Sequence, residues 1–150
     1  MGFDLGVLLA NLIFVFVRTE SIPEQYADKD DYQQWLIELI GEVHALFRKK
    51  LLLLWDEQAR EPVTFYSGFR EFYLSSILHD TAGYAGCELC RRVIGIAKVM
   101  DIASIEDPIR RSKAERLCLH IGKKLILNRS QMDSENHWLS LLTTAKEDAQ

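Results

Sequence analysis

The amino-acid sequence predicts an all-α fold of about five or six helices in a single domain over residues 1–150. Apolar residues recur with helical spacing, most regularly between Tyr32 and Glu57. The only stretch typical of a strand is Val63–Tyr66, which is too short to build a sheet. A content of 48% hydrophobic and 27% charged residues is typical of a globular protein. These observations favour helices packed on helices.

The first predicted helix spans about Phe3 to Val17 and is almost entirely apolar. Its apolar run from Leu5 to Val17 covers 13 residues, fewer than the roughly 20 that cross a bilayer. No basic segment precedes the run and no small-residue cleavage site follows it, so we expect neither a membrane anchor nor a signal peptide. We expect a core helix that is buried on nearly all sides.

The next elements follow from helical periodicity and from breaker residues. A polar connector leads into a long helix from about Tyr32 to Glu57, which Arg60–Pro62 ends. A third helix is predicted to end between Thr81 and Gly86, because two glycines in four residues favour a break. A fourth helix would then begin there and run through Ala97.

The remaining third of the chain reads as a connector, a helix and a short final helix. Asp101–Ser104 is the connector. Ser104 and Asp107 resemble a capping box, with Pro108 in the first turn that follows. The next helix ends at Asn128–Ser130. We expect residues 131–150 to hold a short terminal helix at 135–146 and a polar tail, the helix being anchored by Trp138, Leu141 and Leu142.

Charge and cysteine content narrow the classes of partner. A net charge of −4 with scattered basic pairs argues against nucleic-acid binding. Three cysteines give no disulfide framework, which fits a cytoplasmic protein. Cys87 and Cys90 could join Cys118 and His120 as zinc ligands. The first pair lies within a predicted helix rather than a turn, so we expect small packing residues and no metal.

Arg91 and Arg92 form the one constellation that points to binding chemistry. Two guanidiniums at the start of a helix can hold an anion or a polyol. From spacing alone, the commoner alternative is one arginine in a surface salt bridge and the other in solvent. Asp4 is the second candidate, and its alternative is an acid that bonds to the free amides of the first turn. No residue set for catalysis is evident, and no phosphate-binding loop is present.

Several motifs together resemble one known family, the S-methyl-5-thioribose kinases. The similarity is collinear over about residues 1–130 and corresponds to the C-terminal part of that family. It rests on Met1-Gly-Phe-Asp-Leu-Gly, Leu9-Ala-Asn-Leu, Phe72-Tyr, Asp80-Thr-Ala-Gly-Tyr-Ala-Gly, Arg91-Arg-Val-Ile-Gly, Ile105-Glu-Asp-Pro and Ala114-Glu-Arg.

The resemblance implies the helical C-lobe of a protein-kinase-like fold of the aminoglycoside phosphotransferase branch. Such enzymes phosphorylate methylthioribose with ATP and magnesium in methionine salvage. Their nucleotide-binding and catalytic-loop residues precede the matching segment, so we expect no cofactor in this chain. By resemblance, Arg91 and Arg92 bind the sugar and the transferred phosphoryl group, and Asp4 anchors the catalytic loop.

Two hypotheses about function follow. In the first, the chain is a truncated or split methylthioribose kinase that is inactive alone. In the second, it is a non-catalytic helical module that binds another protein. An apolar patch on the first helix (Phe3, Leu5, Leu8, Leu9 and Leu12) would need cover, either from the missing kinase lobe or from a second copy in a homodimer.

Overall fold

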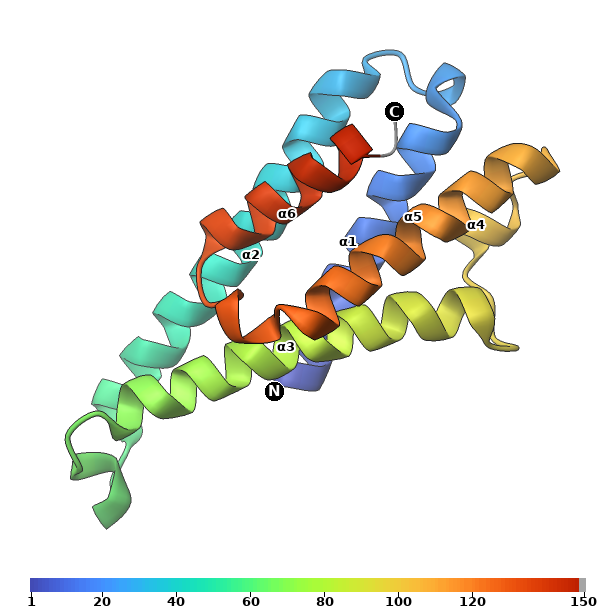
Figure 1. Cartoon of the computed structure of the whole chain (residues 1–150). Helices are drawn as coiled ribbons and strands as arrows, with labels where there is room; N and C mark the ends of the chain where they lie inside the picture. Colours follow the sequence, from blue (N-terminus) through green and yellow to red (C-terminus); the bar gives the residue numbers. More distant parts are fainter. Residues whose placement is uncertain (149–150) are drawn as a thin grey trace.

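The computed structural model describes residues 1–148 and consists of helices throughout this part of the chain (Figure 1). No strand occurs among the described residues, so the prediction of an all-α fold is confirmed. The elements are α1 (Gly2–Ser21), η1 (Pro23–Gln25), α2 (Lys29–Gln58), η2 (Pro62–Phe65), α3 (Phe69–Ile94), α4 (Met100–Ala103), α5 (Pro108–Leu127), η3 (Arg129–Gln131) and α6 (Glu135–Asp148), where η marks a 3₁₀ turn.

The predicted break between Thr81 and Gly86 is wrong, because α3 runs unbroken from Phe69 to Ile94. Of the two glycines there, Gly86 serves helix packing rather than chain reversal. A Cβ atom on Gly86 would lie 2.6 Å from the carbonyl oxygen of Gly122, where α5 crosses α3. A Cβ atom on Gly83 would make only an ordinary van der Waals contact, 3.7 Å from the Arg129 side chain.

Three smaller predictions also change. The candidate strand Val63–Tyr66 lies in the 3₁₀ turn η2 except for its last residue, and most of the predicted connector Asp101–Ser104 lies in α4. Asp107 itself caps α5, accepting hydrogen bonds from the backbone N–H groups of Ile109 and Arg110, so Ser104 is not the cap. Pro108 occupies the first turn of α5, as predicted.

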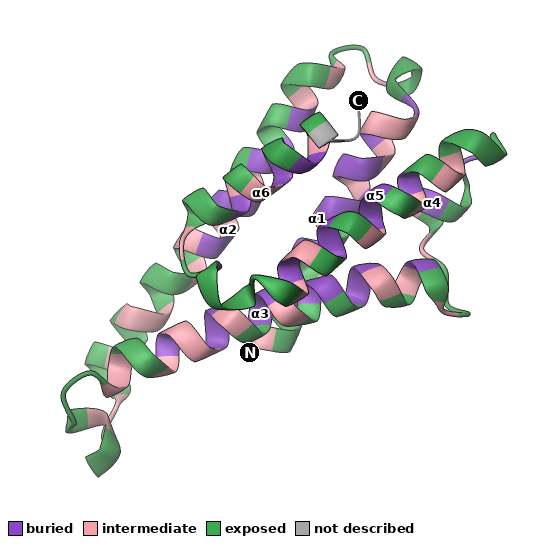
Figure 2. Ribbon diagram, in the orientation of Figure 1, coloured by how far each residue is buried: buried purple, intermediate pink, exposed green. Residues whose placement is uncertain are grey.

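Helices α1, α3 and α5 form the packed body of the molecule. The purple, buried residues of Figure 2 concentrate where these helices meet. Gly6 of α1 lies directly on α3, since a Cβ atom there would come within 2.7 Å of the Thr81 carbonyl oxygen. Small residues at such crossings let two backbones approach closely, and this fixes the rotational setting of each helix. The largest wholly buried side chains include Phe14, Phe16, Leu89 and Ile121.

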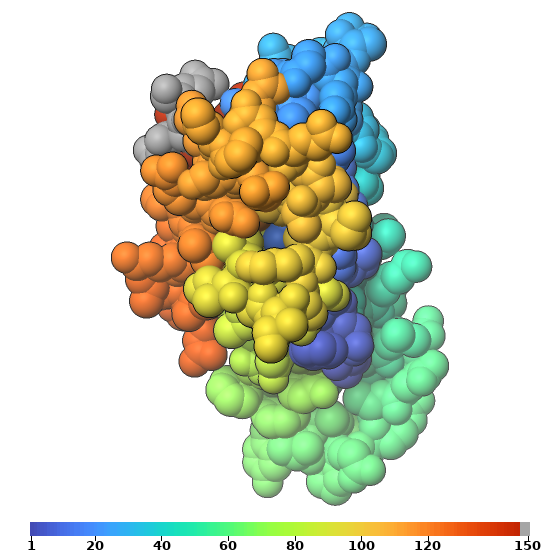
Figure 3. Space-filling model, turned by 90° about the vertical axis from the view of Figure 1, so that its right-hand side faces the viewer, coloured from blue at the N-terminus to red at the C-terminus, as the bar shows by residue number. Residues whose placement is uncertain are grey.

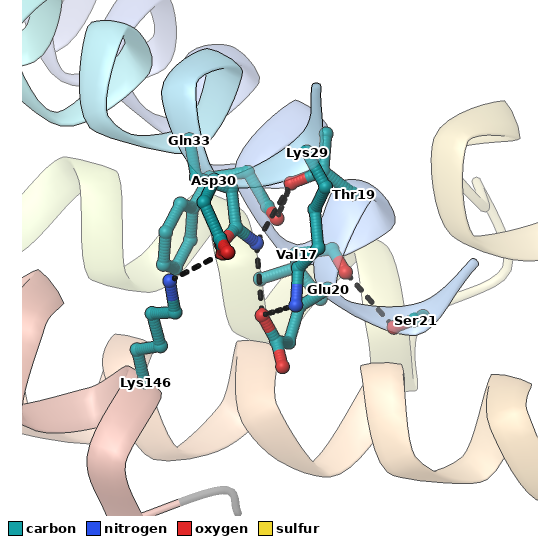
Figure 4. A network of polar contacts seen from close by, with 9 residues as sticks. Val17, Thr19, Glu20, Ser21, Lys29, Asp30, Gln33 and Lys146 are labelled. Atoms are coloured by element: carbon teal, nitrogen blue, oxygen red, sulfur yellow. Dashed lines mark hydrogen bonds and ion pairs between the residues drawn. The ribbon is translucent and has the colours of Figure 1, made fainter. Parts of the chain in front are cut away.

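A polar network joins the end of α1 to the beginning of α2 and to α6 (Figure 4). The buried Gln33 side-chain amide donates to Thr19 Oγ1 at 3.0 Å and to a Glu20 carboxylate oxygen at 2.9 Å. Lys29 pairs with the same Glu20 oxygen at 2.9 Å, and Lys146 of α6 reaches Asp30 at 3.4 Å. Because the network links three helices, it closes the end of the bundle at which α2 begins.

The outer half of α2, η2 and the first turns of α3 form a projecting arm, defined here as residues 45–73. The arm extends away from the body at the lower left of Figure 1 and at the bottom of Figure 3. Trp55 packs against Phe69 and Tyr73 inside it, with ring centroids 6.0 and 5.3 Å apart. Gly68 turns the chain into α3 with φ of 79°, a conformation that glycine adopts without strain.

Helix α1 departs from the expectation of burial on nearly all sides. Leu5 and Leu9 of the expected apolar patch are buried against the body, whereas Phe3 and Leu8 remain about half exposed. The helix has 20 residues and is long and apolar enough to cross a membrane by length and composition alone. Half of the most apolar 18-residue stretch of this helix is buried inside the molecule, as in the core helix of a globular protein. Its length and composition are therefore weak evidence for a membrane span.

Candidate functional site

Arg91 and Arg92 lie in the last turn of α3, not at the start of a helix as the predicted break required. The end of α3 is set by Gly95, whose N–H donates to the Arg91 carbonyl at 2.8 Å. Lys98 donates to the carbonyl of Val93 just beyond the pair. Three cations therefore surround the negative end of the helix dipole, which stabilises them. A helix end of this kind presents carbonyl groups rather than N–H donors.

Glu88 is the residue that organises the arginine pair, and sequence reasoning missed it. Its buried carboxylate accepts from Arg91 Nε and Nη2 through one oxygen, at 3.0 and 2.6 Å. The other oxygen accepts from Arg92 Nε at 2.8 Å. Spacings of three and four residues place these side chains on one face of a helix, so the positions of the three residues in the sequence were a signal that could have found the cluster.

The charges of this cluster favour an ionised glutamate. Burial acts to raise the pKa of Glu88, but the hydrogen bonds and positive charges of Arg92 and Arg91 outweigh it and hold the pKa below its usual value. One carboxylate then offsets two guanidiniums, which leaves the cluster with a net positive charge. Arg91 is 58% exposed and Arg92 34%, so both retain donors that face solvent.

Asp4 is not brought near the arginine pair. Its side chain is 82% exposed and lies 3.6 Å from the amino group of Met1. The first turns of α1 pack beside Ile77 to Ala85, which lies about 15 Å before Arg91 along α3 at 1.5 Å per residue. The structure therefore gives two separate positions, one on α1 and one at the end of α3.

The cysteine and histidine candidates do not form a metal centre in the part of the chain that the structure describes. No group of three or more His, Cys, Asp or Glu side chains has a metal-binding arrangement among these residues. Cys118 is buried, and burial raises the pKa of its thiol to about 12. Such a thiol stays protonated at neutral pH and serves as a packing residue. Cys87, by contrast, is exposed.

A surface hollow with a volume of about 550 Å³ lies between the end of α1 and α5. Arg110, Lys113 and Arg116 line it, and neither Arg91 nor Arg92 does.

Comparison with known proteins identifies the relatives of this chain. Methylthioribose kinase 1 from Oryza sativa is 32% identical over 145 residues, covering 89% of this chain. Methylthioribose kinases from Geobacillus sp. and Exiguobacterium sibiricum are 36% and 35% identical over 93% and 87% of it. The chain is similar to a segment of the methylthioribose kinases. This agrees with the family resemblance seen in the sequence motifs.

The similarity to methylthioribose kinases covers only part of those proteins. The chain spans about a third of the length of the curated relatives it matches, with 34% for the Oryza kinase and 33% for the Geobacillus kinase. No family model matches the chain. The relation is therefore to a portion of a methylthioribose kinase, as expected for a fragment of that enzyme.

Proposed function

We propose that this chain supplies the helical part of a methylthioribose kinase, and that Arg91 and Arg92 bind the sugar and the phosphoryl group transferred to it. The observation that carries the proposal is the 30–36% identity to proteins named methylthioribose kinase over most of the chain. The Glu88 cluster supports it, because solvent-facing guanidiniums with a net positive charge suit a phosphorylated sugar.

The nucleotide and magnesium would be held by protein outside this chain. The sequence contains no phosphate-binding loop, and the described residues do not fit a metal ion. We therefore expect the purified chain to transfer no phosphoryl group from ATP to methylthioribose. We propose that the missing lobe packs on the outer side of α1, where Phe3 and Leu8 are half exposed, and that the protein acts in the cytoplasm.

A chimaera tests the assignment directly. Residues 1–150 would replace the matching segment of the Geobacillus methylthioribose kinase, and ATP-dependent phosphorylation of methylthioribose would be measured. We expect activity, with kcat/KM lowered about 100-fold or more by Arg91→Ala or Arg92→Ala. Arg116→Ala on the exposed side of α5 is the matched control and should have little effect.

Two results would contradict the proposal. A folded chimaera without activity would show that the segment does not perform the family's role. Activity of the isolated chain above a contaminant control would show that the nucleotide site lies within it. For the site alone, NMR spectra of the isolated chain titrated with inorganic phosphate should lose their shift changes near Gly95 in the double alanine variant.

The second hypothesis, a protein-binding module, is favoured by a different observation. The arm exposes Phe65, Tyr66 and Phe72, each about 70% accessible or more. Apolar side chains gathered on a projecting element are typical of surfaces that meet another protein. This role is compatible with the first one, because the arm and the arginine pair lie at opposite ends of α3.

A further inference from the structure

Glu88 differs from the two arginines that it holds in how far it meets solvent. Its side chain is 6% exposed, whereas that of Arg91 is 58% exposed, so a ligand arriving from solvent meets the guanidiniums and not the carboxylate. Among the described side chains, no other acid pairs with Arg91 or Arg92. Glu88 can therefore act on a ligand only through the arginine pair.

The hydrogen bonds to Glu88 determine which edge of each guanidinium faces outward. Arg91 uses its Nε–H and one Nη2 hydrogen on the carboxylate, and Arg92 uses its Nε–H. Arg92 also donates from Nη1 to the Ala97 carbonyl oxygen at 3.4 Å. A guanidinium has five N–H donors and each arginine uses two of them, so three remain on each. Because both guanidiniums are bound to one carboxylate, these free donors are held close together.

We propose that Glu88 is a positioning residue, which holds the guanidiniums of Arg91 and Arg92 side by side so that both bind one phosphoryl group. This inference rests on the proposed function, in which the arginine pair binds the sugar and its phosphoryl group. It adds that the ligand group is a tetrahedral oxyanion whose oxygens accept from both arginines at once. Glu88 itself touches neither the sugar nor the phosphoryl group.

The need for such a residue follows from the repulsion between two neighbouring cations. The carboxylate between Arg91 and Arg92 offsets this repulsion, so both guanidiniums stay near one point before any ligand binds. Without the carboxylate we expect the two side chains to move apart into solvent. A phosphoryl group would then have to bring them together and immobilise them, which lowers affinity.

Net charge and positioning make opposite predictions for the loss of this carboxylate. Glu88→Gln removes one negative charge from a cluster with two guanidiniums, which raises its net charge from one positive charge to two. If the arginines acted by charge alone, the variant would bind phosphate more tightly. If Glu88 positions them, the variant binds phosphate more weakly in spite of its higher charge. The direction of the change in affinity therefore separates the two accounts.

Titration of the full chain with inorganic phosphate, followed by NMR, tests the proposal. The dissociation constant would be measured for the wild type and for Glu88→Gln. We expect Glu88→Gln to raise it about fivefold or more, because the two guanidiniums are no longer held together. Glu42→Gln, at an exposed position on α2, is the matched control. It removes the same charge from the protein and should leave the dissociation constant unchanged.

The side-chain Nε–H resonances of Arg91 and Arg92 report the positioning directly. In the wild type, the hydrogen bonds to Glu88 should protect both Nε–H groups from exchange with water. Arg91→Lys and Arg92→Lys assign the two resonances by removing them one at a time. We expect both groups to lose this protection in Glu88→Gln, an effect that a change in global stability alone would not produce.

Three outcomes would overturn the role of Glu88. One is equal or tighter phosphate binding in a Glu88→Gln protein whose circular dichroism shows intact helices. Another is an equal loss of affinity in Glu42→Gln, which would assign the effect to overall charge. The third is rapid exchange of both Nε–H groups in the wild type.

Failure of the proposed function would have a different result. Shift changes on phosphate addition that persist in the Arg91→Ala/Arg92→Ala double variant would show that the arginine pair is not the binding site. Loss of those shift changes in the double variant, together with unchanged affinity in Glu88→Gln, would leave the arginine site in place and remove only the role of Glu88.

Discussion

The body and the arm of this molecule are both helical, yet they are built on opposite principles. In the body, Gly6 and Gly86 let helices touch backbone to backbone, and side chains such as Leu89 are wholly buried. In the arm, α2 packs on little beyond the first turns of α3, and leucines such as Leu53 remain about half exposed. Figure 2 shows this contrast as purple in the body against green and pink in the arm. The comparison teaches that the body buries most of its apolar side chains, whereas the arm leaves many of its own exposed to solvent.

The largest expected effect comes from one substitution made in both regions. Leu89→Ala in the body should lower the free energy of unfolding by about 3 kcal/mol, because it leaves a cavity among buried neighbours. Leu53→Ala in the arm should change it by no more than about 0.5 kcal/mol, because half of that side chain already meets water. Urea unfolding at low protein concentration measures both, and equal losses would contradict the division.

A pair of glycines on α3 separates close packing from helix propensity. Gly86→Ala should cost about 2 kcal/mol, because its Cβ would overlap the Gly122 carbonyl oxygen. Gly83→Ala is the control on the same helix. Its Cβ has space, so the higher helix propensity of alanine should add up to about 1 kcal/mol of stability. Thermal unfolding measures the melting temperatures of both variants. A shift of both melting temperatures in the same direction would contradict the close packing of Gly86 on α5.

Two acid-to-amide changes compare the ion pairs of the regions. Glu88→Gln removes a buried charge that joins Arg91 to Arg92, and we expect a loss of about 1 kcal/mol after allowance for the solvent that reaches Arg91. Asp56→Asn removes an exposed partner of Arg70 in the arm and should leave the melting temperature unchanged. A larger effect of Asp56→Asn would mean that the arm holds its shape through charge.

The smallest expected effect on stability comes from His44, which lies where α2 leaves the body and enters the arm. His44 is wholly buried, its ring lies 5.9 Å from that of Trp138, and neither ring nitrogen has a hydrogen-bond partner among the described residues. Burial is the main cause that lowers its pKa, with Arg48 acting the same way. The pKa is raised, to a smaller extent, by the negative charges of Glu135 and Asp133 and by the Met132 backbone. The folded protein therefore binds a proton less readily than the unfolded chain.

Stability should consequently decrease as pH falls below 6.5, the ordinary pKa of histidine, and should be fully retained above it. His44→Phe should reduce this dependence, because it removes the group that titrates. His137→Phe, at a half-exposed position on α6, is the matched control and should keep it. Unfolding curves between pH 5 and 8, a range chosen because histidine titrates there, measure the difference. If the free energy of unfolding of His44→Phe decreased with falling pH as steeply as that of the wild type, other groups would cause the pH dependence.

The sequence allowed the long helices to be predicted because their apolar spacing is regular. The ends of α2 and α5 and the anchoring of α6 by Trp138 and Leu142 are confirmed within a few residues. The break at Gly83–Gly86 failed because a glycine signals flexibility and close packing alike, and only the neighbouring helix decides between them. That neighbour, Gly122 on α5, lies 36 residues away and leaves no mark in local sequence.

The sequence selected the residues of the candidate site but not their geometry. Arg91 and Arg92 were selected by their adjacency and by the family resemblance, and their role stays a prediction. Their setting at the end of α3 depended on the length of the helix, which was misjudged, whereas their link through Glu88 follows the three- and four-residue spacing of any helix. The positions of Asp4 and the buried His44 depend on tertiary packing, which periodicity does not encode.

The crossing at Gly86 and Gly122 has a consequence for conformational entropy at the end of α3. The crossing holds α3 about one and a half turns before Arg91. The two guanidiniums therefore extend from a backbone that has already lost its freedom during folding, and Glu88 restricts their rotamers further. A ligand that binds there would have to immobilise little more than itself. Gly86→Ala should thus weaken phosphate binding through increased motion, with every arginine still in place.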